Sequence, residues 1–116
     1  MRRTALSSLI PAIGLALGAP AMAQDATWDG DTNVNWSDPA NWDTGALPTG
    51  VASFPSALTP NQPDLDANQT IEALKFSKTD GGWILSGTGN ELEINGGDGS
   101  GVYIEDLATS GATTID

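Results

Sequence analysis

A series of short apolar segments, each ended by a turn, constrains the fold of this chain more than any other feature. In residues 91–94, Leu92 and Ile94 alternate with Glu91 and Glu93, which places the two aliphatic side chains on one face of an extended strand. The turns that end these segments are rich in glycine. We therefore expect an all-β fold, in which similar strands occupy residues 71–76, 83–86, 102–105 and 113–115.

The apolar positions of these segments recur at a nearly constant spacing. Leu74, Ile94 and Ile115 form one series, in which each residue follows the one before it by about one repeat length of a solenoid. A second series has the same spacing and comprises two pairs, Trp83 with Tyr103 and Ile84 with Ile104. Such a recurrence predicts a β-solenoid, in which each rung lays short strands on those of the rung beneath. A small β-sandwich is the alternative, because only about two and a half repeats are present.

Residues 24–70 have a different composition, dominated by Asp, Asn, Pro, Gly, Thr and Trp. These residue types favour turns, so we expect an irregular cap or lead-in with short extended pieces at residues 26–28, 51–54 and 63–65. Three tryptophans lie close together in this segment and the fourth lies in the strand region; they are Trp28, Trp36, Trp42 and Trp83. The favoured interpretation is a structural plug at the open end of the solenoid. The alternative is a platform on which sugar rings stack.

Residues 1–23 have the pattern of a secretory signal peptide. Arg2 and Arg3 are followed by a short apolar run, and residues 21–23 form a small-x-small cleavage site. The apolar run is too short to span a membrane. We expect an exported chain that begins at Gln24, with residues 24–70 as the cap and residues 71–116 as the first solenoid rungs, the chain ending within the solenoid.

Removal of the signal peptide leaves fifteen acidic residues against Lys75 and Lys78, a net charge of −13. A surface this acidic repels nucleic acids and anionic lipids, so we expect no nucleic-acid partner. The chain has no cysteine and no histidine. Zinc, haem and iron–sulfur sites therefore lack their usual ligands, and a Ser-His-Asp or Cys-His mechanism lacks its base.

Two other patterns carry oxygen ligands or carboxylates. Asp29, Asp31 and Asn33 are spaced like the first half of a calcium-binding loop, although Ala40 stands where such a loop needs a glutamate. A solvated turn is the favoured interpretation, and calcium is the alternative cofactor. The carboxylate pairs Asp64/Asp66 and Glu91/Glu93 have a spacing compatible with glycosidase chemistry, but surface strands carry such pairs routinely.

The order of these motifs resembles the N-terminal part of exported bacterial proteins with autotransporter-associated β-strand repeats. The resemblance covers nearly all of the chain after the signal peptide. It rests on the motifs Trp28-x-Gly30, Asn35-Trp36-Ser37, Asn41-Trp42, Leu47-Pro48, Phe54, Ile71 with Leu74-x-Phe76, and Trp83-Ile84-Leu85-Ser86-Gly87-x-Gly89-x-x-Leu92-x-Ile94. It implies a right-handed β-helix that continues into further rungs of the same or a longer chain, in a protein of the outer membrane or cell surface.

No pattern in the sequence indicates catalysis. We therefore expect a non-catalytic module of a secreted or cell-surface β-helical protein, with cell adhesion as its candidate activity and glycans or cell surfaces as its candidate partners. Two alternatives stay open. One is a carbohydrate-binding module that uses surface tryptophans, and the other is the opening segment of a β-helical polysaccharide-degrading enzyme.

Overall fold

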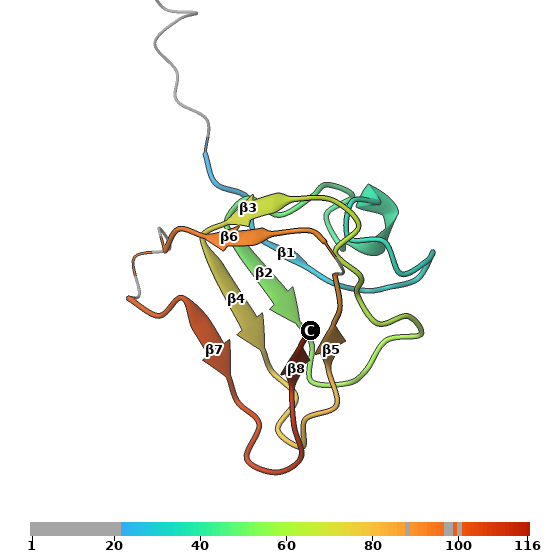
Figure 1. The fold of residues 1–116 in the computed structure, drawn as a ribbon, viewed down its shortest axis with the longest axis vertical. Helices are drawn as coiled ribbons and strands as arrows, with labels where there is room; N and C mark the ends of the chain where they lie inside the picture. The colour runs from blue at the N-terminus through green and yellow to red at the C-terminus, as the bar shows by residue number, and fades with distance from the viewer. Residues whose placement is uncertain (1–21, 88, 97–98, 100) are drawn as a thin grey trace, which may run out of the picture.

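The computed structural model describes residues 22–87, 89–96, 99 and 101–116 (Figure 1). Most of the expected signal peptide, residues 1–21, lies outside the described residues. The described residues form short strands and one short 3-10 helix, so the expected all-β class is confirmed. In chain order these elements are β1 (Ala26–Thr27), η1 (Pro39–Asn41), β2 (Val51–Phe54), β3 (Gln69–Ile71), β4 (Ala73–Phe76), β5 (Ile84–Leu85), β6 (Leu92–Ile94), β7 (Ile104–Asp106) and β8 (Thr114–Ile115).

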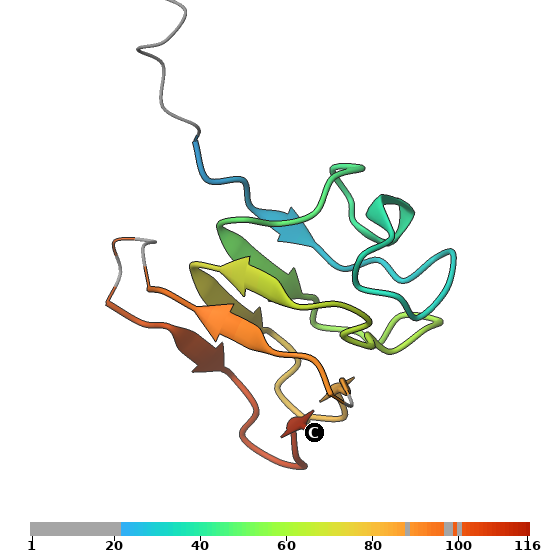
Figure 2. The same ribbon diagram turned by 45° about the horizontal axis from the view of Figure 1, so that its top comes forward.

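The strands pair into three separate parallel sheets (Figure 2). The largest sheet has the order β1-β2-β4-β7, and the two smaller sheets pair β3 with β6 and β5 with β8. Every pairing between these named strands is parallel. This is not the antiparallel pairing of the β-sandwich that the sequence left as an alternative.

The register differs from the expected one. Leu74, Ile94 and Ile115 lie in three different sheets, where they pair with Ile104, Ile71 and Leu85 respectively. The expected stacking of Ile84 on Ile104 is also wrong, because Ile84 pairs with Thr114. The constant spacing read from the sequence therefore joined strands that belong to different sheets.

The expected strand at residues 71–76 is in fact two strands. The chain turns a corner at Glu72, so that β3 and β4 belong to different sheets. The Gly50 carbonyl accepts a hydrogen bond from the Glu72 N–H at 3.0 Å, and the Glu72 carbonyl accepts one from the Gly96 N–H at 2.8 Å. These bonds join the corner to the segments before and after it. A sequence window sees one apolar run here because both strands bury side chains into the same core.

Burial decreases along the chain. Phe54 and Ile71 are fully buried, and Leu74, Phe76 and Leu85 are nearly so. Leu92 and Ile94 pack against the same core but stay partly exposed. In the last strands, Ile104 of β7 is 51% exposed and Ile115 of β8 is 54% exposed. The hydrophobic core thus lies between the early strands and is open at β7 and β8.

Candidate functional site

Six buried rings form an aromatic cluster within the hydrophobic core: Trp28, Trp36, Trp42, Phe54, Phe76 and Trp83. Phe54 is its middle, because its ring contacts the five others at centroid distances from 4.9 to 6.4 Å. Trp42 also packs edge-on against Trp28 at 5.2 Å and against Trp36 at 4.8 Å. Sequence reasoning found the four tryptophans but missed Phe54 as the residue that joins them.

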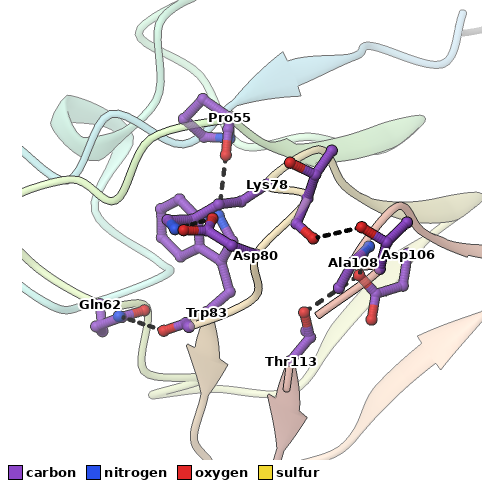
Figure 3. A network of polar contacts seen from close by, with 11 residues as sticks. Pro55, Gln62, Lys78, Asp80, Trp83, Asp106, Ala108 and Thr113 are labelled. Atoms are coloured by element: carbon purple, nitrogen blue, oxygen red, sulfur yellow. Dashed lines mark hydrogen bonds and ion pairs between the residues drawn. The ribbon is translucent and has the colours of Figure 1, made fainter. Parts of the chain in front are cut away.

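Backbone carbonyls hold three of the four indole N–H groups. The Trp28 indole donates to the Asn61 carbonyl and the Trp42 indole to the Trp36 carbonyl, each at 2.9 Å. The Trp83 indole donates to the Pro55 carbonyl at 2.9 Å, as Figure 3 shows. The four tryptophans are only 0–2% exposed, so none of these rings offers a face to solvent. Their burial is that of core residues, and a stacking platform of surface tryptophans is not formed by these rings.

A buried asparagine organises the loop between the first two strands. The Asn41 side-chain oxygen accepts hydrogen bonds from the Thr32 and Asn33 N–H groups, at 3.0 and 3.1 Å. Its amide group donates to the Asn33 side-chain oxygen and to the Asn35 carbonyl, at 2.8 and 2.9 Å. Asn41 is fully buried, and its side chain satisfies four backbone or side-chain groups of one loop. The Asn-Trp motif thus places a polar anchor beside a hydrophobic one.

The three calcium candidates, Asp29, Asp31 and Asn33, have different surroundings. The Asn33 side-chain oxygen is already occupied by the Asn35 N–H and the Asn41 amide, while Asp31 is exposed. Asp29 has one buried carboxylate oxygen, Oδ1, without a hydrogen-bond partner among the described residues. Within that part of the chain, no group of three or more acidic side chains is arranged to hold a metal ion. The loop's own hydrogen bonds therefore already use the Asn33 side-chain oxygen.

Asp64 and Asp66 each have a serine partner. Asp64 accepts a hydrogen bond from the Ser86 hydroxyl at 3.1 Å. Asp66 accepts from the N–H and the hydroxyl of Ser37. Burial by itself raises the pKa of the Asp66 carboxyl, but the hydrogen bonds from Ser37 and from the Asp66 backbone together outweigh it and hold the pKa below its ordinary value. These carboxylates therefore link segments that are far apart in the sequence.

A shallow groove of about 310 Å³ lies along the four-stranded sheet. Its polar groups come from Asp25, Ser53, Lys75 and Glu105, and its apolar walls from Val51, Ala73, Leu74 and Val102. Lys75 and Glu105 form an ion pair at 3.8 Å with both side chains 43% exposed, so solvent screens it strongly. Neither carboxylate pair that the sequence singled out lines this groove. Ser53 and Lys75 meet in this groove because they hold matching positions in the paired strands β2 and β4, a register that the sequence does not show.

Polar side chains also hold the loops in place, which sequence reasoning missed. The Gln62 amide donates to the Gly82 carbonyl at 2.9 Å and accepts from the Ile84 N–H at 3.0 Å, at the start of β5. In Figure 3, the Asp106 carboxylate accepts from the Ala108 N–H at 3.1 Å and from the Thr113 hydroxyl at 3.2 Å. These side chains fix the turns between strands that are too short to fix them alone.

Comparison with protein-family models, curated proteins and solved structures gives no match for this chain. The resemblance to autotransporter-associated repeats therefore stays a prediction from the motifs. Among the described residues, no helix has the length and apolar character needed to cross a membrane.

Proposed function

We propose that this chain is the non-catalytic N-terminal module of a secreted or cell-surface β-helical protein of the passenger type, consisting of a cap and the first rungs of a right-handed β-helix. The observation that carries the proposal is the order in which the chain visits its three parallel sheets. The chain passes from β2 of the four-stranded sheet to the Asp64 bridge, which lies beside the end of β5, and then to β3 of the β3–β6 sheet. It follows the same order of sheets through β4, β5 and β6, and again through β7 and β8. Parallel pairing with a constant order of visits is what a coil produces, and parallel crossovers are almost always right-handed.

The two ends of the stack differ in a way that supports a cap followed by rungs. At the first end, Trp28 and Trp42 form an isolated bridge directly after β1, and their buried rings fill the space beside Phe54. At the other end, Ile104 and Ile115 are more than half exposed, although their partners Leu74 and Leu85 are buried. A further rung would cover these residues as β7 and β8 cover the strands before them.

The role that we assign is structural and interactive, with adhesion as the candidate activity. The serine partners of Asp64 and Asp66 support a structural role for these carboxylates. The charge of −13 after signal-peptide removal supports a function in a medium rich in electrolytes, because counterions relieve the repulsion between the acidic groups. Export rests on the pattern of residues 1–23.

The test is to extend the stack by one coil. A second copy of residues 87–116 is appended after Asp116, because the pairing of Leu85 with Ile115 sets the length of one coil. If the chain is a β-helix with an open end, the added coil buries the exposed residues of the last strands. We expect the melting temperature to rise by at least about 4 °C, the shift that roughly 1 kcal/mol gives in a domain of this size.

The matched control has the same added length but serine in the appended copies of Leu92, Ile94, Ile104 and Ile115. The control should melt at the temperature of the unextended chain, because its added strands have no aliphatic side chain to bury. Equal melting temperatures of the apolar and serine extensions would remove the β-helical proposal. Adhesion is tested with cells that display the chain on their surface. If these cells bind host-cell or glycan-coated surfaces no better than cells that do not display it, the adhesive activity is refuted.

A further inference from the structure

Gln24 is the first described residue whose backbone is hydrogen-bonded to the rest of the fold. The Gln24 N–H donates to the Thr49 hydroxyl at 2.9 Å. The Gln24 carbonyl accepts from the N–H groups of Thr49 and Gly50, at 2.9 and 2.8 Å. Met22 is 89% exposed, and neither it nor Ala23 has a hydrogen bond among the described residues. The first residue that the fold holds is thus the one that follows the expected cleavage site.

The side chain of Gln24 is free although its backbone is held. The residue is exposed, and its amide makes no hydrogen bond within the described part of the chain. A Cβ atom at Gly50 would lie 3.3 Å from the carbonyl carbon and oxygen of Gln24, so glycine leaves room for the close approach of these backbones. The backbone atoms next to the future terminus are therefore fixed, and the amide that could react with that terminus can rotate beside them.

We propose that Gln24 is a modification site, at which the terminus exposed by signal-peptide removal cyclises to pyroglutamate. The α-amino nitrogen attacks the side-chain amide carbon Cδ, a new C–N bond closes a five-membered lactam, and the Cδ–Nε2 bond breaks with release of ammonia. No oxidant or cofactor is needed. Cyclisation uses the neutral amine, and because an α-amino group has a pKa of about 7.7–8.0, a useful fraction is neutral near pH 7.

The hydrogen bonds at Gln24 are compatible with this ring. The lactam nitrogen keeps one hydrogen, which can still be donated to the Thr49 hydroxyl. The main-chain carbonyl takes no part in the reaction and keeps its bonds to Thr49 and Gly50. Cyclisation thus removes the free amine that aminopeptidases require without breaking a bond that fastens β1. The inference depends on removal of residues 1–23 and is independent of the β-helical proposal.

The test uses the full chain, residues 1–116, expressed in a bacterium with a secretory pathway and purified from the periplasm or medium. Intact-mass measurement and N-terminal peptide sequencing by mass spectrometry locate the first residue. We expect a chain that begins at Gln24, is lighter by one ammonia than the uncyclised form, and is blocked to Edman degradation. A free amine on Gln24, or any other first residue including Met1, would overturn the proposal.

The control variant is Gln24→Glu, which keeps the backbone bonds but must lose water in place of ammonia and so cyclises much more slowly. We expect this variant to begin at residue 24 with a free amine and to be trimmed by an aminopeptidase that leaves the unsubstituted protein intact. Equal trimming of the two proteins would also contradict the proposal. Stability of the extended chain with a second copy of residues 87–116 does not depend on this modification, so the two proposals fail separately.

Discussion

Replacement of Phe54 tests whether ring contacts or simple burial hold this small core together. Phe54 and Phe76 are equally buried, but Phe54 contacts five rings, whereas Phe76 contacts only the Phe54 ring within the described part of the chain. Replacing either residue by leucine removes a similar apolar area. Each aromatic pair adds about 0.5–1.5 kcal/mol beyond its buried area. We therefore expect Phe54→Leu to cost at least about 1 kcal/mol more than Phe76→Leu.

The assay is urea unfolding followed by the fluorescence of the four tryptophans, which neither substitution removes. Phe54→Ala should be more severe, with a cost of about 3–5 kcal/mol, enough to lower the melting temperature by roughly 12 °C or more in a domain of this size. Leu58→Ala, at a side chain that is 45% exposed, should change the stability by less than about 0.5 kcal/mol. Equal losses in Phe54→Leu and Phe76→Leu, within about 0.5 kcal/mol, would refute the central role of Phe54.

Three further predictions concern the loops. Gly30→Ala should destabilise the fold much more than Gly45→Ala in thermal melts, although both residues have positive φ. A Cβ at residue 30 would lie 2.6 Å from the Asn61 carbonyl and the Trp28 indole nitrogen, whereas at Gly45 nothing lies within 4 Å. Equal effects of the two substitutions would contradict this close packing. Asn41→Ala should cost about 1–3 kcal/mol in urea unfolding, because it leaves buried groups of the loop unpaired. Ser37→Ala should destabilise the protein at pH 7 but have little effect near pH 2. The hydrogen bonds that lower the Asp66 pKa stabilise the fold at pH values above 3.8, the ordinary pKa of this carboxyl, and this stabilisation is lost as the pH falls through the lower folded-state pKa. A pH-independent effect of Ser37→Ala would contradict this assignment.

Local patterns predicted most strands well, and the reason is physical. The expected extended pieces at residues 51–54 and 83–86 correspond closely to β2 and β5, because alternation and turn residues act over a few positions. β5, β6 and β7 are separate strands, as the glycines between them in the sequence predict. The candidate calcium ligands illustrate the limit of such patterns. Their spacing was suitable, but hydrogen bonds from Asn35 and Asn41 occupy the Asn33 side-chain oxygen.

The sequence by itself determined that the chain is all-β and that three of its four tryptophans lie near the first strands, since both properties follow from residue types and their local order. Only the tertiary structure decided which strands pair. Leu74 meets Ile104, and not Ile94, because the chain crosses two other sheets before it returns, and the lengths of the turns set that distance. The tertiary structure also brings Phe54, Phe76 and Trp83 together from separate segments, so the aromatic core is a property of the whole fold and not of any one segment.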